Sequence, residues 1–178
     1  METKGSFMRT TLCAFVMLLG ASVAGAQEHA HAVKSVTVDI KNAQGQNIGT
    51  AVLTPAPKGV RIKLDIKDLP PGEHSIHIHQ FAKCEAPDFK SAGPHFDPTG
   101  MGHMHDMPPA GDIPDFALVV GQDGTAHATT TAPNVTLGSD EHSVFSNGGT
   151  AIVIHAVAGG TGTAAPARIA CGVITKPE

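Results

Sequence analysis

The chain has 178 residues, of which 41% are hydrophobic and 16% are charged, and its formal net charge is −4. Low charge content and the lack of a basic excess argue against a disordered chain and against a nucleic-acid-binding protein. The length suits one folded domain. Eleven histidines are many for such a chain, so we expect its function to depend on them.

Residues 1–26 have the pattern of an export signal. Lys4 and Arg9 supply positive charge, residues 12–19 form an apolar core, and a small-residue cleavage pattern follows. The apolar core is too short for a good membrane anchor, so we expect no membrane attachment after cleavage. The sequence therefore predicts a signal peptide over 1–26 and a mature domain over 27–178 that is exported, most simply to the periplasm.

Two cysteines, Cys84 and Cys171, remain once Cys13 leaves with the signal. In an exported protein two cysteines most simply form one disulfide. The chain-entropy model gives such a long loop roughly 4–5 kcal/mol of stabilisation before any strain. Two buried free thiols are the alternative interpretation.

Short stretches of alternating apolar and polar residues follow one another along the mature chain, separated by Gly, Pro and Asn. The candidate strands are residues 33–41, 48–53, 60–66, 73–80, 115–120, 125–131, 150–156 and 168–174. Short strands of period two between such turns predict an all-β sandwich or barrel. Segments 84–114 and 158–167 resist strand assignment, and loops this long are usually functional.

Three histidines lie where a metal site could form. His77 and His79 are two residues apart on a candidate strand, so their side chains project from one face. His155 ends another candidate strand and can meet them if the two strands are neighbours. Imidazole suits copper and zinc, and a carboxylate together with imidazole suits zinc.

The first long loop carries further candidate donors, which are His95, His103, His105, Asp106 and Asp112. Methionines alternate with the middle histidines of this loop, at Met101, Met104 and Met107. Soft thioethers favour Cu(I), although packing against the barrel is an alternative role for them. The remaining candidates are interpreted as ordinary surface or core residues (His127, His142) and as part of a flexible tail (His29, His31).

The chain resembles the copper/zinc superoxide dismutases of the exported bacterial kind. The motifs that carry the resemblance are His77-Ile78-His79, the run from Cys84 through Gly93-Pro94-His95 to Pro98, Gly111-Asp112-Ile113-Pro114, Ile154-His155, and Arg168 to Ile174. They occur in the family's order and cover about residues 33–174. The resemblance implies an eight-stranded Greek-key β-sandwich or flattened barrel with two long functional loops, which agrees with the strand pattern.

The resemblance also implies an enzyme that converts superoxide to O2 and H2O2 by cycling copper between Cu(II) and Cu(I). The implied roles are copper ligands (His77, His79, His155), a copper–zinc bridge and proton donor (His95), zinc ligands (His103, Asp112), a disulfide (Cys84, Cys171), attraction of the superoxide anion (Arg168) and a structural histidine (His74). Both a monomer and a homodimer are compatible with these motifs.

Three departures from the family pattern predict an altered zinc site and a more open copper site. Pro109 stands where the family has a zinc histidine, and proline offers no ligand atom. His105 could substitute, or His103 and Asp106 could supply a different pair. No carboxylate follows His155, and the loop after it is short and without charge. We therefore expect copper as the cofactor, with zinc absent, weak or rearranged.

A second hypothesis comes from a different class of protein. The methionine–histidine alternation in the first long loop would also suit a periplasmic copper-binding or copper-delivery protein on a dismutase scaffold. Such a protein would bind Cu(I) through thioethers and imidazoles and would have no significant dismutase activity.

Overall fold

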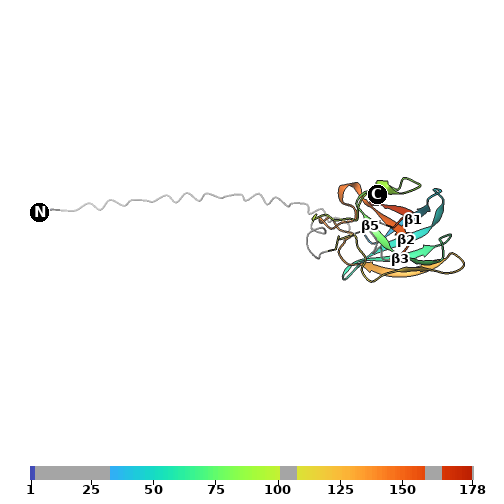
Figure 1. Ribbon diagram of the computed structural model, residues 1–178. Helices are drawn as coiled ribbons and strands as arrows, with labels where there is room; N and C mark the ends of the chain where they lie inside the picture. Colours follow the sequence, from blue (N-terminus) through green and yellow to red (C-terminus); the bar gives the residue numbers. More distant parts are fainter. Residues whose placement is uncertain (3–32, 101–107, 159–165, 178) are drawn as a thin grey trace. The chain divides into compact units, whose positions relative to one another are not determined.

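The computed structural model describes residues 1–2, 33–100, 108–158 and 166–177. Its strands, in chain order, are β1 (Val36–Asn42), β2 (Asn47–Ala56), β3 (Gly59–Ile66), β4 (Gly72–His74), β5 (Ile76–His79), β6 (Leu118–Val120), β7 (Ala126–Ala132), β8 (Thr150–His155) and β9 (Arg168–Ile174) (Figure 1). Two short 3-10 helices, η1 (Lys90–Ala92) and η2 (Ser146–Gly148), are the only helices among the described residues. None of the described helices is long and apolar enough to cross a membrane.

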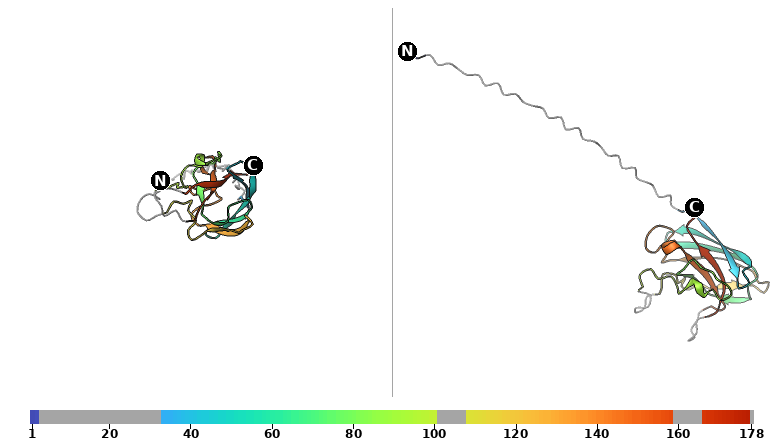
Figure 2. Two further views of the ribbon diagram at one scale, coloured as in Figure 1. Left: turned by 45° about the vertical axis from the view of Figure 1, so that its right-hand side comes forward. Right: turned by 90° about the horizontal axis from the view of Figure 1, so that it is seen from above.

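The strands form one curled antiparallel sheet in the order β5-β8-β9-β1-β2-β3-β7, and β4 pairs with β6 in a second, two-stranded sheet. β4 runs into β5 with only Ser75 between them. β6 runs into β7 through a turn in which the Gly121 N–H donates to the Thr125 carbonyl. The small sheet therefore links the two ends of the large one, and the strands curl around a common interior (Figure 2). The all-β barrel prediction is confirmed.

Alternation along the strands explains why these segments pack as they do. In β3, Val60, Ile62, Leu64 and Ile66 are buried while the residues between them are exposed. Fully burying one such side chain contributes roughly 1.5–3 kcal/mol, so the register that places all four inside is strongly favoured.

Strand β8 is buried on both faces because a loop covers its outer side. Phe89 and Ala92 of that loop pack with Ala151 and Val153 of β8 and with Cys171 of β9 in a small apolar cluster. This packing holds the loop that leads to His95 against the sheet.

The predicted disulfide is present in the structure. Cys84, in the same loop, is bonded to Cys171 of β9, and their Cα atoms lie 5.7 Å apart. The covalent link and the apolar cluster together tie residues 84–93 to β8, which carries His155, and to its partner β9.

Several predicted strand limits are wrong: β1, for example, begins at Val36 instead of residue 33. For three further differences the structure gives a local reason. The predicted strand 73–80 is interrupted at Ser75, because the chain changes partners there: β4 pairs with β6, whereas β5 pairs with β8. β6 begins at Leu118 instead of residue 115, because Asp115 has a φ of 56° and cannot extend a strand.

The third wrong boundary is the end of β2, which continues through Pro55 to Ala56. Val36, the first residue of β1, pairs with Leu53, so among the described residues β2 has no ladder partner on that side beyond this point. The missing N–H of Pro55 therefore breaks no ladder bond there.

Candidate metal centre

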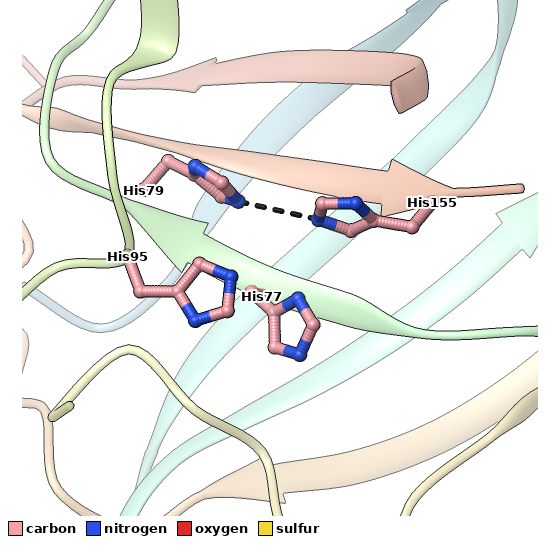
Figure 3. Close-up of side chains that lie close together, drawn as sticks. All are labelled: His77, His79, His95 and His155. Carbon is pink, nitrogen blue, oxygen red and sulfur yellow. Dashed lines mark hydrogen bonds between the residues drawn. The ribbon is translucent and has the colours of Figure 1, made fainter. Parts of the chain in front are cut away.

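Four histidines converge at one edge of the large sheet (Figure 3). β5 brings His77 and His79, and its antiparallel partner β8 brings His155. The loop after β5 returns so that the backbone of His95 bridges that of His79. One nitrogen from each ring lies within 4.8 Å of the other three. The predicted convergence of His77, His79 and His155 is therefore seen, with His95 beside them.

The tautomers of His79 and His155 follow from their backbone partners. His79 Nδ1 lies 2.9 Å from the Gly93 carbonyl, and His155 Nδ1 lies 3.2 Å from the Pro166 carbonyl. A carbonyl only accepts, so we assign the ring proton to Nδ1 in both residues. Each Nε2 then carries a bare lone pair.

These two lone pairs face each other. The Nε2 atoms of His79 and His155 lie 3.3 Å apart, along the dashed line of Figure 3. Burial is the main cause that lowers the pKa of His79 to about 3 and also lowers the pKa of His155. Neither ring therefore carries a second proton, on Nε2, at neutral pH. No proton lies between the two Nε2 lone pairs, and a metal cation between them would bind both.

His77 supplies a further nitrogen in need of a partner. Its Nδ1 is buried and has no hydrogen-bond partner, which costs about 1–3 kcal/mol when left unsatisfied. Burial, with help from His95 and His155, lowers the pKa of His77 to about 4. The His77 and His95 rings stack with centroids 4.1 Å apart. Four imidazoles without a carboxylate or thiolate among them fit copper.

Arg168 lies directly across the ladder from His155. Its Nη1 donates to the Phe89 carbonyl at 2.8 Å and its Nη2 to the Gly93 carbonyl at 2.7 Å. The Gly93 carbonyl thus accepts from both Arg168 and His79. Partial burial lowers the pKa of Arg168, but a guanidinium starts so high that it stays charged. A cation is therefore fixed beside the histidine cluster.

His74 is buried but lies outside the four-histidine cluster. Its two ring nitrogens contact the carbonyls of His155, at 2.9 Å, and Pro70, at 2.8 Å. Both contacts are to backbone, which supports its predicted structural role.

The predicted zinc residues are placed only in part. Asp112 lies beside His95, with Oδ1 2.6 Å from Nδ1. Pro109 has no donor side chain, and its carbonyl accepts from the Asp112 N–H. The other candidates in this loop, His103, His105, Asp106, Met101, Met104 and Met107, lie outside the described residues. Within the described part of the chain, two donors do not make a zinc site.

The remaining histidines do not join the cluster. His127 is exposed and lies 3.2 Å from Asp65, and His142 contacts the Asn134 carbonyl. His29 and His31 lie outside the described residues, as does most of the predicted signal peptide.

Sequence reasoning missed the backbone carbonyl of Gly93 as a partner of His79 and Arg168. The signal for it was a glycine just before a proline and His95, and this glycine has a φ of 76°.

Fold and site together define a β-barrel with a four-imidazole cluster suited to a copper ion. Residues 47–174 match the family model for copper/zinc superoxide dismutase. The superoxide dismutase [Cu-Zn] 1 of Aquifex aeolicus is 40% identical over 149 residues, which cover 76% of this chain and 85% of that protein. The superoxide dismutase [Cu-Zn] of Caulobacter vibrioides is 36% identical over 155 residues, covering 79% and 85%. The chain belongs to the copper/zinc superoxide dismutase family.

Solved structures agree with this placement. A SOD-like protein from Bacillus subtilis is 30% identical with a TM-score of 0.67, covering 77% of this chain and 96% of that one. The Cu/Zn superoxide dismutase from Brucella abortus is 28% identical with a TM-score of 0.62, covering 79% and 99%. The barrel prediction and the resemblance seen in the sequence are both confirmed.

Proposed function

We propose that this chain is an exported superoxide dismutase whose copper ion is held by His77, His79, His95 and His155. The observation that carries the proposal is the convergence of four imidazoles within a barrel of this family. Copper bound to imidazoles would cycle between Cu(II) and Cu(I), so that one superoxide is oxidised to O2 and the next, with one electron and two protons, is reduced to H2O2.

Arg168 attracts the superoxide anion in this proposal. Two carbonyls hold its guanidinium at a fixed place next to His79. A guanidinium has five N–H donors, so donors remain for an anion after those two bonds. In a protein of net charge −4, this local positive field is what draws an anion to the site.

His95 moves a proton in this proposal. Its Nε2, once it no longer holds reduced copper, would take up a proton and pass it to the reduced product. Its position at the loop side of the cluster, stacked on His77, supports this role.

The zinc half of the site is incomplete or rearranged in our proposal. Pro109 removes a ligand atom, and of the residues that the structure describes only His95 and Asp112 offer donors there. Copper is therefore the metal on which activity depends. The short uncharged loop after His155 leaves the copper site more open, which stays a prediction because residues 159–165 lie outside the described part.

Export to the periplasm is also part of the proposal. The disulfide is typical of an oxidising compartment, and residues 1–26 have the pattern of a signal peptide. The mature domain then begins at Gln27 and has no membrane attachment.

Elemental analysis of the purified mature protein, beside a dismutation assay, tests the function. We expect one copper per chain and dismutation far above the rate of the same amount of free copper. A copper-loaded protein that dismutes no faster than free copper would reject the proposal. It would favour the copper-delivery alternative, whose methionines can be tested by Cu(I) stoichiometry after their replacement.

A further inference from the structure

Asp112 and His95 form the closest polar side-chain contact of the site. Asp112 Oδ1 lies 2.6 Å from His95 Nδ1, and both side chains are partly exposed, at 27% and 32%. We propose that Asp112 is a positioning residue that holds His95 by a direct hydrogen bond, in place of a zinc ion between them. This inference rests on the proposed copper site.

The distance between Asp112 Oδ1 and His95 Nδ1 distinguishes a direct hydrogen bond from ligation of one zinc ion by both residues. Two ligands on a tetrahedral zinc, with bonds of about 2.0–2.2 Å, have ligand atoms about 3.3 Å apart. The separation of 2.6 Å is instead that of a short, charge-assisted hydrogen bond. His95 Nδ1–H therefore donates to the Asp112 carboxylate, and the lone pair of His95 lies on Nε2, the nitrogen that remains for copper.

Backbone bonds place Asp112 at this distance. The preceding residue, Gly111, donates to the Phe96 carbonyl at 2.7 Å and accepts from the Ile78 N–H at 2.9 Å. Ile78 lies between His77 and His79, so the same network joins Asp112 to the copper-binding strand. A Cβ atom at Gly111 would collide with the Ile78 carbonyl oxygen, so this close approach requires glycine.

The departure at Pro109 contributes to the arrangement. The Asp112 N–H donates to the Pro109 carbonyl at 3.0 Å, which closes a tight turn and aims the carboxylate at His95. The position that lacks a zinc ligand atom thus helps to fix Asp112. A carboxylate that accepts from a ligating histidine sets the ring orientation and raises its basicity, and its removal typically costs 10–100-fold in metal affinity.

The test compares two aspartates that face a histidine. Asp112→Asn keeps the shape and removes the charge at His95. Asp65→Asn is the matched control, because Asp65 faces His127 at 3.2 Å on the exposed surface, with both side chains mostly exposed at 68% and 73%. Each protein is offered copper and zinc in equal amounts, and metal content, copper affinity by chelator competition and the Cu(II) EPR spectrum are measured.

We expect one copper and no stoichiometric zinc in the unmodified protein. Asp112→Asn should lower copper affinity about 10–100-fold and alter the EPR spectrum, Asp112→Glu should restore part of the affinity, and Asp65→Asn should change neither. One zinc per chain that disappears in Asp112→Asn would overturn the inference, because Asp112 would then be a zinc ligand. Unchanged copper affinity and EPR in that variant would overturn it as well.

A measurement on the unmodified chain covers the case in which Asp112→Asn fails to fold. In the diamagnetic Cu(I)-loaded protein with zinc present, ¹⁵N NMR should show a proton on His95 Nδ1. A metallated Nδ1 would contradict the proposal. Because this readout needs copper binding but no turnover, failure of the dismutase activity and failure of the Asp112 role remain distinguishable.

Discussion

The two halves of the histidine site are built differently. His77, His79 and His155 lie on β5 and β8, which are paired strands of the large sheet. His95 and Asp112 lie on loop segments that are held to the sheet by backbone bonds, by the packing of residues 84–93 and by the disulfide. A pairing register suffices to bring the backbones of the sheet half together, whereas the loop half depends on particular glycines and carbonyls. Pro109, which has no ligand atom, lies in the loop half.

The largest effect is expected from His77→Ala, which breaks the sheet half. It removes the buried Nδ1 that has no other partner, so copper binding and dismutation should fall by at least about 100-fold, the upper range for disturbing a metal site. Metal analysis and the dismutation assay check this. His127→Ala, on the exposed surface of β7, should leave both unchanged, and a His77→Ala protein that keeps its copper would contradict the assignment.

Gly111→Ala tests the loop half. The added methyl meets the Ile78 carbonyl, so the free energy of unfolding should fall by about 1–3 kcal/mol, with weaker copper binding. Thermal unfolding measures the loss. Gly45→Ala is the comparison, because nothing lies within 4 Å of a Cβ there; its φ of 76° should cost about 1 kcal/mol without affecting copper. Equal copper affinity in both variants would show that the loop half does not position the site.

Arg168→Ala tests the connection between the two halves. The Arg168 guanidinium, which extends from β9, donates to two carbonyls of the loop. Copper content should stay, while kcat/KM falls about tenfold and loses its dependence on ionic strength, as expected when a local attracting charge is removed. Arg61→Ala on β3 is the control and should change neither value. Loss of copper in Arg168→Ala would mean that the residue mainly supports the loop.

The smallest effect is expected from pH on the metal-free protein. The pKa values of His77 and His79 are lowered from 6.5 to about 4 and about 3, so the unfolded chain binds more protons below pH 6.5. Stability is therefore present above that pH and is lost as the pH falls towards these values. Between pH 7 and pH 5 the melting temperature should drop by about 4 °C or more. A melting temperature that rises on acidification would contradict the burial of these neutral rings.

Most of the sheet half could be predicted from the sequence, because alternation and spacing are local. Period-two patterns located eight strands, and the spacing of His77 and His79 placed both rings on one face. The disulfide between Cys84 and Cys171 could be predicted because only these two cysteines remain in an exported chain after signal cleavage. The break at Ser75 could not be predicted, since it arises from a partner, β8, that lies far along the chain.

The sequence by itself determined the barrel, the three strand histidines and the absence of a side-chain ligand atom at Pro109. Only the tertiary structure decided which nitrogen of each ring is free, that Gly93 serves both His79 and Arg168, and that Asp112 contacts His95 directly. These features depend on backbone carbonyls brought together by strand pairing and loop packing. Every residue has a backbone carbonyl, so the residue type does not indicate which carbonyl will accept a hydrogen bond at the site. Only its position in the folded chain decides this.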